Sequence, residues 1–64
     1  MKREKILKYF RQHNCEVFRE GKRHTIIINL TNDKVTALPR HPDINDKLVL
    51  SMCKDLEIPK IQSH

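Results

Sequence analysis

Residues 26–28 are three consecutive isoleucines near the middle of the chain. Such β-branched residues favour extended backbone, because their side chains pack well on a pleated sheet and lose rotamer freedom in a helix. The run is bounded by the only glycine in the sequence, Gly21, and by the turn-forming segment 31–33 (Thr-Asn-Asp). The sequence therefore predicts a strand over residues 24–30 between two turns, and such short turns join antiparallel strands.

Two further strands are expected on either side of this central strand. Residues 16–19 precede the glycine turn, and residues 34–38 follow the second turn. Gly21 is expected to take a positive φ angle in the first turn, because glycine adopts that conformation without a steric penalty. Pro39 is expected to end the third strand, since proline cannot continue a central strand.

Two segments have the spacing of amphipathic helices. Residues 2–13 place apolar side chains on one face, and Asn14 is a suitable stop because asparagine tolerates left-handed backbone. A second helix is expected to begin near Asn45 and to be stopped by Pro59. Its predicted apolar face consists of Leu48, Val49, Met52, Cys53 and Leu56.

The predicted fold is therefore α+β, with element order α-β-β-β-α and two helices on a three-stranded antiparallel sheet. A chain of 64 residues forms one small domain, and burial of only roughly 60% of its surface leaves room for a single thin core. We expect that domain to span residues 1–59, with residues 60–64 as a flexible C-terminal tail. Any chemistry must then occur on the surface or in a shallow groove.

Alternation along the central strand decides which side chains face the helices. We assign Ile26 and Ile28 to the face under the helices, and Ile27 to the open face. His24 is then expected at the start of the strand, at the rim of the helix-covered face and beside the glycine turn. An exposed Ile27 could serve as a contact with a partner protein.

Charge and cysteine content narrow the classes of function. Thirteen Lys and Arg residues against eight Asp and Glu residues give a net charge of +5, which favours polyanions or simply forms a solvated basic surface. Cys15 and Cys53 form no Cys-x-x-Cys pair and are expected to be reduced and buried. With no apolar run that could span a membrane and no secretion signal, the protein is expected in the cytoplasm.

Three stretches together resemble the HicA family of toxins from bacterial toxin–antitoxin pairs. They are residues 18–25 (FREGKRHT), residues 35–41 (VTALPRH) and residues 44–59. The first is similar to the family's arginine, glycine and histidine at the head of the second strand, although two basic residues here separate Gly21 from His24. The second is similar to its third strand with a proline and a basic turn, and the last to its closing helix.

The resemblance implies a fold like that of the double-stranded-RNA-binding domain. It also implies endoribonuclease activity on mRNA, with His24 at the position of the catalytic histidine. A HicB-type antitoxin protein would neutralise the activity by covering the active site.

RNA chemistry agrees with the choice of His24. The 2′-OH of RNA can attack the adjacent phosphate, so cleavage needs a base, a proton donor for the leaving oxygen and positive charge around the phosphate. A histidine can act as base and as acid near neutral pH. Considered alone, a histidine at a strand end is more often a solvated or hydrogen-bonded structural residue.

Lys22, Arg23 and Arg40 are the expected RNA-binding residues, because two precede His24 and the third follows the adjoining strand. Each could equally be a solvated turn residue, and the basic residues of the first helix are weaker candidates. His41 could be a second acid–base group, but between two prolines and beside Arg40 it is expected to order its turn. The histidines and cysteines lack metal-ligand spacing, so neither a metal nor another cofactor is expected.

Two alternatives have the same fold. One is a non-catalytic RNA-binding module, although readers of double-stranded RNA usually carry several lysines at the start of the last helix, where only Lys47 stands here. The other is an inactive protein that only binds its antitoxin.

Overall fold

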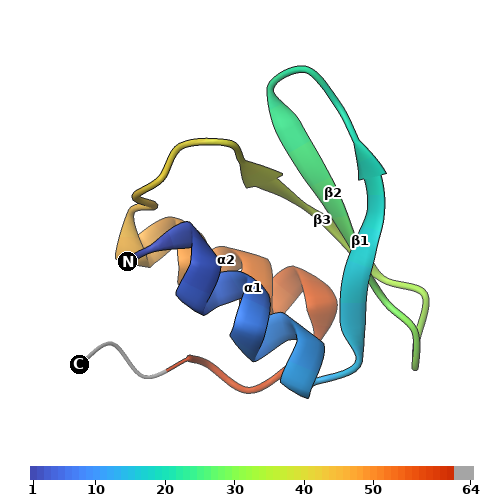
Figure 1. The fold of residues 1–64 in the computed structure, drawn as a ribbon. Helices are drawn as coiled ribbons and strands as arrows, with labels where there is room; N and C mark the ends of the chain where they lie inside the picture. Colours follow the sequence, from blue (N-terminus) through green and yellow to red (C-terminus); the bar gives the residue numbers. More distant parts are fainter. Residues whose placement is uncertain (62–64) are drawn as a thin grey trace.

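The computed structural model describes residues 1–61. Its elements are α1 (Arg3–Gln12), β1 (Cys15–Glu20), β2 (His24–Asn29), β3 (Val35–Pro39) and α2 (Asp46–Leu56). The strands form one antiparallel sheet in the order β1-β2-β3, and both helices lie against the same face of it (Figure 1). The predicted α+β class and the order α-β-β-β-α are confirmed.

The helix α1 buries Ile6 and Phe10 on its inner face and packs against β1. It ends where predicted, because Asn14 takes left-handed backbone with a φ of 62°. The chain then turns directly into β1 through Cys15, which is buried. The position of α1 is thus fixed by a local stop signal and by two apolar side chains.

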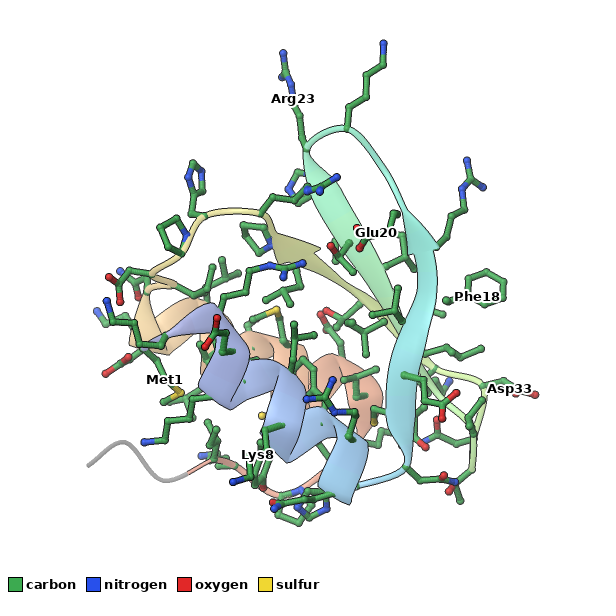
Figure 2. The ribbon with its side chains drawn as sticks, viewed as in Figure 1. Met1, Lys8, Phe18, Glu20, Arg23 and Asp33 are labelled. Atoms are coloured by element: carbon green, nitrogen blue, oxygen red, sulfur yellow. The ribbon has the colours of Figure 1, made fainter. Side chains whose placement is uncertain are left out.

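The β1–β2 hairpin contains a β-bulge. Val17 lies opposite Ile27 and Arg19 lies opposite Ile26, so that Phe18 has no register partner. The Phe18 side chain is exposed and points away from the helices (Figure 2). Beyond the bulge, the tip of the hairpin extends past the helical layer (Figure 1), which leaves residues 21–24 accessible.

The helix α2 begins as predicted but ends earlier than predicted. Asn45 caps its start, since the Asn45 side chain accepts a 2.8 Å hydrogen bond from the Lys47 N–H. The helix ends at Leu56 because Glu57 takes left-handed backbone with a φ of 58°, before Pro59 is reached. The assignment of Leu48 to the apolar face is wrong, because its side chain is 40% exposed.

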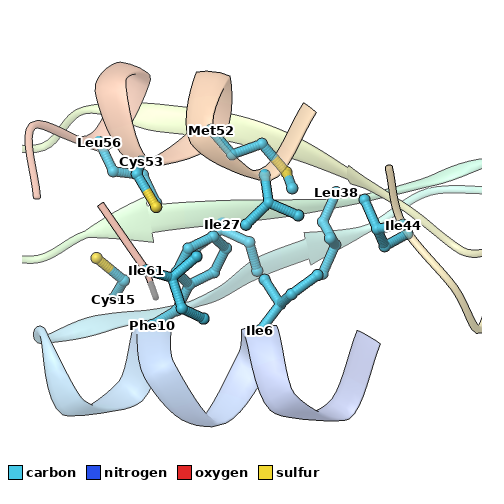
Figure 3. Packing of buried hydrophobic residues seen from close by; sticks show 11 residues of the cluster. Ile6, Phe10, Cys15, Ile27, Leu38, Ile44, Met52, Cys53, Leu56 and Ile61 are labelled. Carbon is cyan, nitrogen blue, oxygen red and sulfur yellow. The ribbon is translucent and has the colours of Figure 1, made fainter. Parts of the chain in front are cut away.

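The buried hydrophobic side chains form one cluster between the sheet and the two helices. Ile27 lies at its centre, between Ile6 and Phe10 of α1 and Met52 of α2 (Figure 3). The predicted assignment of faces along β2 is therefore wrong: Ile27 is fully buried, whereas Ile26 and Ile28 are half-buried on the open face. His24 shares that open face, because it alternates with the buried Thr25.

Two polar residues of β2 point into the helix-covered side because each finds hydrogen-bond partners there. The Thr25 hydroxyl donates a 2.7 Å hydrogen bond to Glu20 and accepts one of 2.6 Å from Arg3. The Asn29 side chain donates a 2.8 Å bond to the Leu56 carbonyl and accepts one of 2.9 Å from the Thr31 N–H. Burying a polar group costs little free energy when the group has hydrogen-bond partners. Thr25 and Asn29 can therefore face the helices, and Ile27 occupies the core between them.

The segment after α2 belongs to the domain. Ile61 is 7% exposed and completes the core cluster, and the Tyr9 hydroxyl donates a 2.6 Å hydrogen bond to the Pro59 carbonyl. The expected domain end at residue 59 is therefore too early. The rest of the expected tail, residues 62–64, lies outside the described residues.

Both cysteines are buried and unbridged, as predicted. Burial raises the pKa of the Cys15 and Cys53 thiols, and the nearby Cys53 thiol raises the pKa of Cys15 further. Neither helix of the described chain has the length and apolar content that a membrane crossing requires.

Candidate nucleic-acid interface

His24 is exposed at the head of β2, on the sheet face that the helices leave open. Its register partner on β3 is Pro39, and Ile26 follows it on the same face. The imidazole is thus carried by a strand whose opposite side is anchored in the core by Ile27. This arrangement presents a histidine to solvent on a rigid element, as a catalytic group requires.

Gly21 closes the hairpin tightly against His24. The Gly21 N–H donates a 2.8 Å hydrogen bond to the His24 carbonyl, and a Cβ added at Gly21 would lie 3.0 Å from that same oxygen. The predicted positive φ at Gly21 is wrong, since no described glycine has one. Glycine is favoured here by the close approach of two backbone segments.

Lys22 and Arg23 form the tip of the hairpin, and both are exposed. Arg23 projects away from the body of the protein (Figure 2). Within residues 1–61, neither side chain forms an ion pair. Both charges are therefore available to a polyanion that approaches the hairpin.

Arg40, the third predicted RNA-binding residue, lies directly after β3 and reaches back to the hairpin. Its guanidinium donates a 2.9 Å hydrogen bond to the Gly21 carbonyl and lies 3.6 Å from a carboxylate oxygen of Glu20. Its side chain remains 48% exposed, and a guanidinium has five N–H donors. Arg40 thus holds the glycine turn from the side of the sheet where Glu20 lies, with donors left free, at the same end of the sheet as His24.

A polar network that the sequence reasoning missed lies beneath the site. Arg3 of α1 and Glu20 of β1 both bind the Thr25 hydroxyl, and Glu20 also faces Arg40. Glu20 and Thr25 are register partners on the helix-covered side, so this carboxylate lies on the opposite side of the sheet from His24. The network links the helical layer to the hairpin and to Arg40.

Arg19 is a second residue that the prediction did not include. It lies opposite Ile26, and therefore shares the open face with His24. Its side chain is exposed. The signal was present in the sequence, because Arg19 belongs to the FREGKRHT stretch, but the bulge at Phe18 that sets its side could not be foreseen.

A hollow of about 520 Å³ borders the site at Arg40. Lys2, Arg3 and Pro42 line it as well, together with the carboxylate of Glu4. The Nε of Arg3 is buried without a hydrogen-bond partner among the described residues. The hollow lies where the start of α1 meets the end of β3, and it extends the basic surface beyond the hairpin.

The other histidines in the described chain are separate from this site. His13 packs its ring against that of Tyr9, with ring centroids 4.4 Å apart, and His41 is exposed in the segment between β3 and α2. Across residues 1–61, no group of three or more His, Cys, Asp and Glu side chains is arranged to hold a metal ion.

The site therefore has an exposed imidazole that shares the open face with Arg19, two cations at the hairpin tip, and Arg40 at the same end of the sheet on the side of Glu20. Comparisons with protein-family models, with curated proteins and with solved structures give no match for this chain.

Proposed function

We propose that this protein is a toxin of the HicA type: an endoribonuclease that cleaves mRNA through acid–base catalysis by His24, without a metal ion. The observation that carries the proposal is the position of His24. It is exposed at the head of a strand, and Lys22, Arg23 and Arg40 lie at the same end of the sheet.

The chemistry requires one proton acceptor, one proton donor and positive charge. The neutral imidazole takes the proton of the ribose 2′-OH as that oxygen forms a bond to the neighbouring phosphorus. The bond from phosphorus to the 5′-oxygen breaks, and the imidazolium returns a proton to that oxygen. The surrounding guanidinium and ammonium groups stabilise the charge that develops on the phosphoryl oxygens.

The open sheet face supports the proposed antitoxin partner. It exposes apolar side chains next to His24: Ile26 and Ile28 of β2 are half-buried, and Val35 and Ala37 of β3 are exposed opposite them. Contiguous exposed apolar surface with a charged rim is typical of protein interfaces. We propose that a HicB-type antitoxin binds this face and covers His24, so that the partner contacts are Ile26 and Ile28 rather than the buried Ile27.

The test is RNA cleavage by the purified protein. A single-stranded mRNA is incubated with the protein in the presence and absence of EDTA, beside the His24→Ala and His41→Ala variants. We expect cleavage that survives EDTA, that His41→Ala retains and that His24→Ala loses by at least about 10²-fold, as for removal of a general acid–base group. Circular dichroism spectra should show that both variants remain folded, because both residues are exposed.

Three outcomes would contradict the proposal in different ways. RNA binding without cleavage by the unaltered protein indicates a non-catalytic RNA-binding module. Cleavage that His24→Ala does not reduce removes His24 from the mechanism. Binding of a small acidic protein encoded next to this one, with no activity on RNA, indicates a protein that acts only through that partner.

A further inference from the structure

A second basic surface lies on the side of the helices that faces away from the sheet. Two neighbouring hollows occur there, of about 390 Å³ beside α1 and about 530 Å³ beside α2, and Lys60 borders both. The lysines that line them, which we name the lysine face, are Lys5, Lys8, Lys47, Lys54 and Lys60. Lys8 points away from the sheet in Figure 2.

The residues that line the lysine face carry more positive than negative charge. Within the described part of the chain, none of its five members forms an ion pair. Glu57 is the one acidic residue that lines either hollow, and its carboxylate lies 3.8 Å from Lys34, a residue outside the lysine face. By contrast, Lys2 and Arg40 each face an aspartate or a glutamate.

The segment after α2 fixes Lys60 between the two helices. On one side of it, the Pro59 carbonyl accepts the 2.6 Å hydrogen bond from Tyr9 of α1. On the other side, Ile61 is buried in the core. Lys60 is therefore held where it borders both hollows, between the lysines of α1 and those of α2.

We propose that the lysine face binds the phosphodiester backbone of RNA at a segment distant from the one that reaches His24. The helical layer separates this surface from the open sheet face, so the two surfaces contact different parts of a bound strand. Ammonium groups on long side chains are mobile point charges, which suit phosphates more than base edges. The choice of RNA as the ligand rests on the proposed function, whereas the existence of an anion-binding surface does not.

The distribution of side chains favours a nucleic acid over an acidic protein. Exposed apolar side chains lie next to one another on the sheet face, at Val35 and around Ile26 and Ile28, whereas Leu50 is the one exposed large apolar side chain among the residues that line the two hollows. The lysine face surrounds its two hollows with five lysines. Binding through it releases counterions, so the affinity should fall steeply with salt and depend little on sequence.

The experiment measures binding of a fluorescently labelled single-stranded RNA at a series of salt concentrations. All proteins carry His24→Ala, so that cleavage does not interfere. A first pair of substitutions, Lys8→Gln and Lys60→Gln in one protein, is compared with a second pair, Arg11→Gln and Lys34→Gln in another. The second pair removes the same charge at positions outside both basic surfaces. We expect the plot of log K against log salt concentration to become less steep by about 1.4 for the first pair, because each lost phosphate contact to a single strand removes about 0.7 from the magnitude of the slope. The slope for the second pair should stay unchanged.

Equal slopes and affinities for the two pairs would overturn the proposal. Loss of poly-glutamate binding in the first pair, with RNA binding unaffected, would also overturn it and would assign the surface to an acidic polypeptide. The result is independent of the proposed catalysis, because lysine-dependent RNA binding by a protein that never cleaves RNA would support this surface and refute only the ribonuclease activity.

Discussion

His24 and Pro39 are register partners on adjacent strands, at the same end of the sheet. The residue after Pro39 is Arg40, whose guanidinium binds the carbonyl of Gly21, and the Gly21 N–H in turn binds the carbonyl of His24. The β1–β2 turn and the segment after β3 are thereby joined at the end of the sheet that carries His24. The site depends on this junction, and the first two predictions test it.

Gly21→Ala should destabilise the protein by about 1 kcal/mol, as small overpacking substitutions do. The added methyl group would lie 3.0 Å from the backbone oxygen of His24, which cannot move without disturbing the hairpin. Urea unfolding measures the change, with Lys22→Ala in the same turn as the control. An unchanged free energy of unfolding for Gly21→Ala would show that the hairpin has room to relax.

Arg40→Gln should lower kcat/KM for RNA cleavage by at least about tenfold, since a hydrogen bond to a charged group contributes about 1.5 kcal/mol or more. The substitution removes both a charge that we propose acts on the bound RNA and the hydrogen bond to Gly21. Initial cleavage rates measure the effect. Lys34→Gln, which removes a cation paired with Glu57, is the control and should cleave normally. Equal rates for the two variants would exclude Arg40 from RNA binding.

The assignment of faces along β2 predicts different costs for two chemically identical substitutions. Ile27→Val should lower the free energy of unfolding by about 1 kcal/mol, because a methyl group is lost from a close-packed core. Ile28→Val should cost clearly less, since Ile28 is half-buried on the open face. Thermal or urea unfolding compares the two. A larger loss of stability for Ile28→Val than for Ile27→Val would favour the face assignment made from the sequence.

Stability should decrease at alkaline pH. Burial raises the pKa of Cys15 and Cys53 above the ordinary thiol value of 9.0, and that of Tyr9 above 10.0. The folded state therefore holds these protons more tightly than the unfolded state. The resulting stabilisation is complete below the unfolded pKa values and is lost as the pH rises towards the folded ones.

Urea unfolding between about pH 7 and about pH 10 measures this loss. The Cys53→Ala variant should show a shallower decline, because one of the titrating groups is removed. A free energy of unfolding that does not change over this range would show that the buried thiols do not control alkaline stability.

The element order was predictable because each element has a local signal. Asn14 and Asn45 mark the end of α1 and the start of α2, and the isoleucine run marks the central strand. The face of that strand was not predictable from polarity, because Thr25 and Asn29 are polar yet buried. Thr25 binds Arg3 of α1 and Asn29 binds the Leu56 carbonyl of α2, and such long-range contacts leave no pattern in the local sequence.

Part of the candidate site was predictable because it too depends on local signals in the sequence. The positions of Lys22 and Arg23 follow from the hairpin, which the sequence indicates. Arg19 was missed because its side of the sheet is set by the bulge at Phe18, and a bulge has no reliable signal in a single sequence. The burial of Ile61 was missed because it depends on contacts with the core cluster, whose other members are distant in sequence.

The bulge at Phe18 has a consequence for association as well. β1 is an edge strand, and a regular edge offers unpaired N–H and C=O groups to any other chain that can add a strand. The irregular backbone at Phe18 interrupts that template on one side of the sheet. On the opposite edge, Pro39 removes a donor from the last position of β3. A protein that exposes apolar side chains on its open face is thereby protected at both edges from growing into an extended, aggregated sheet.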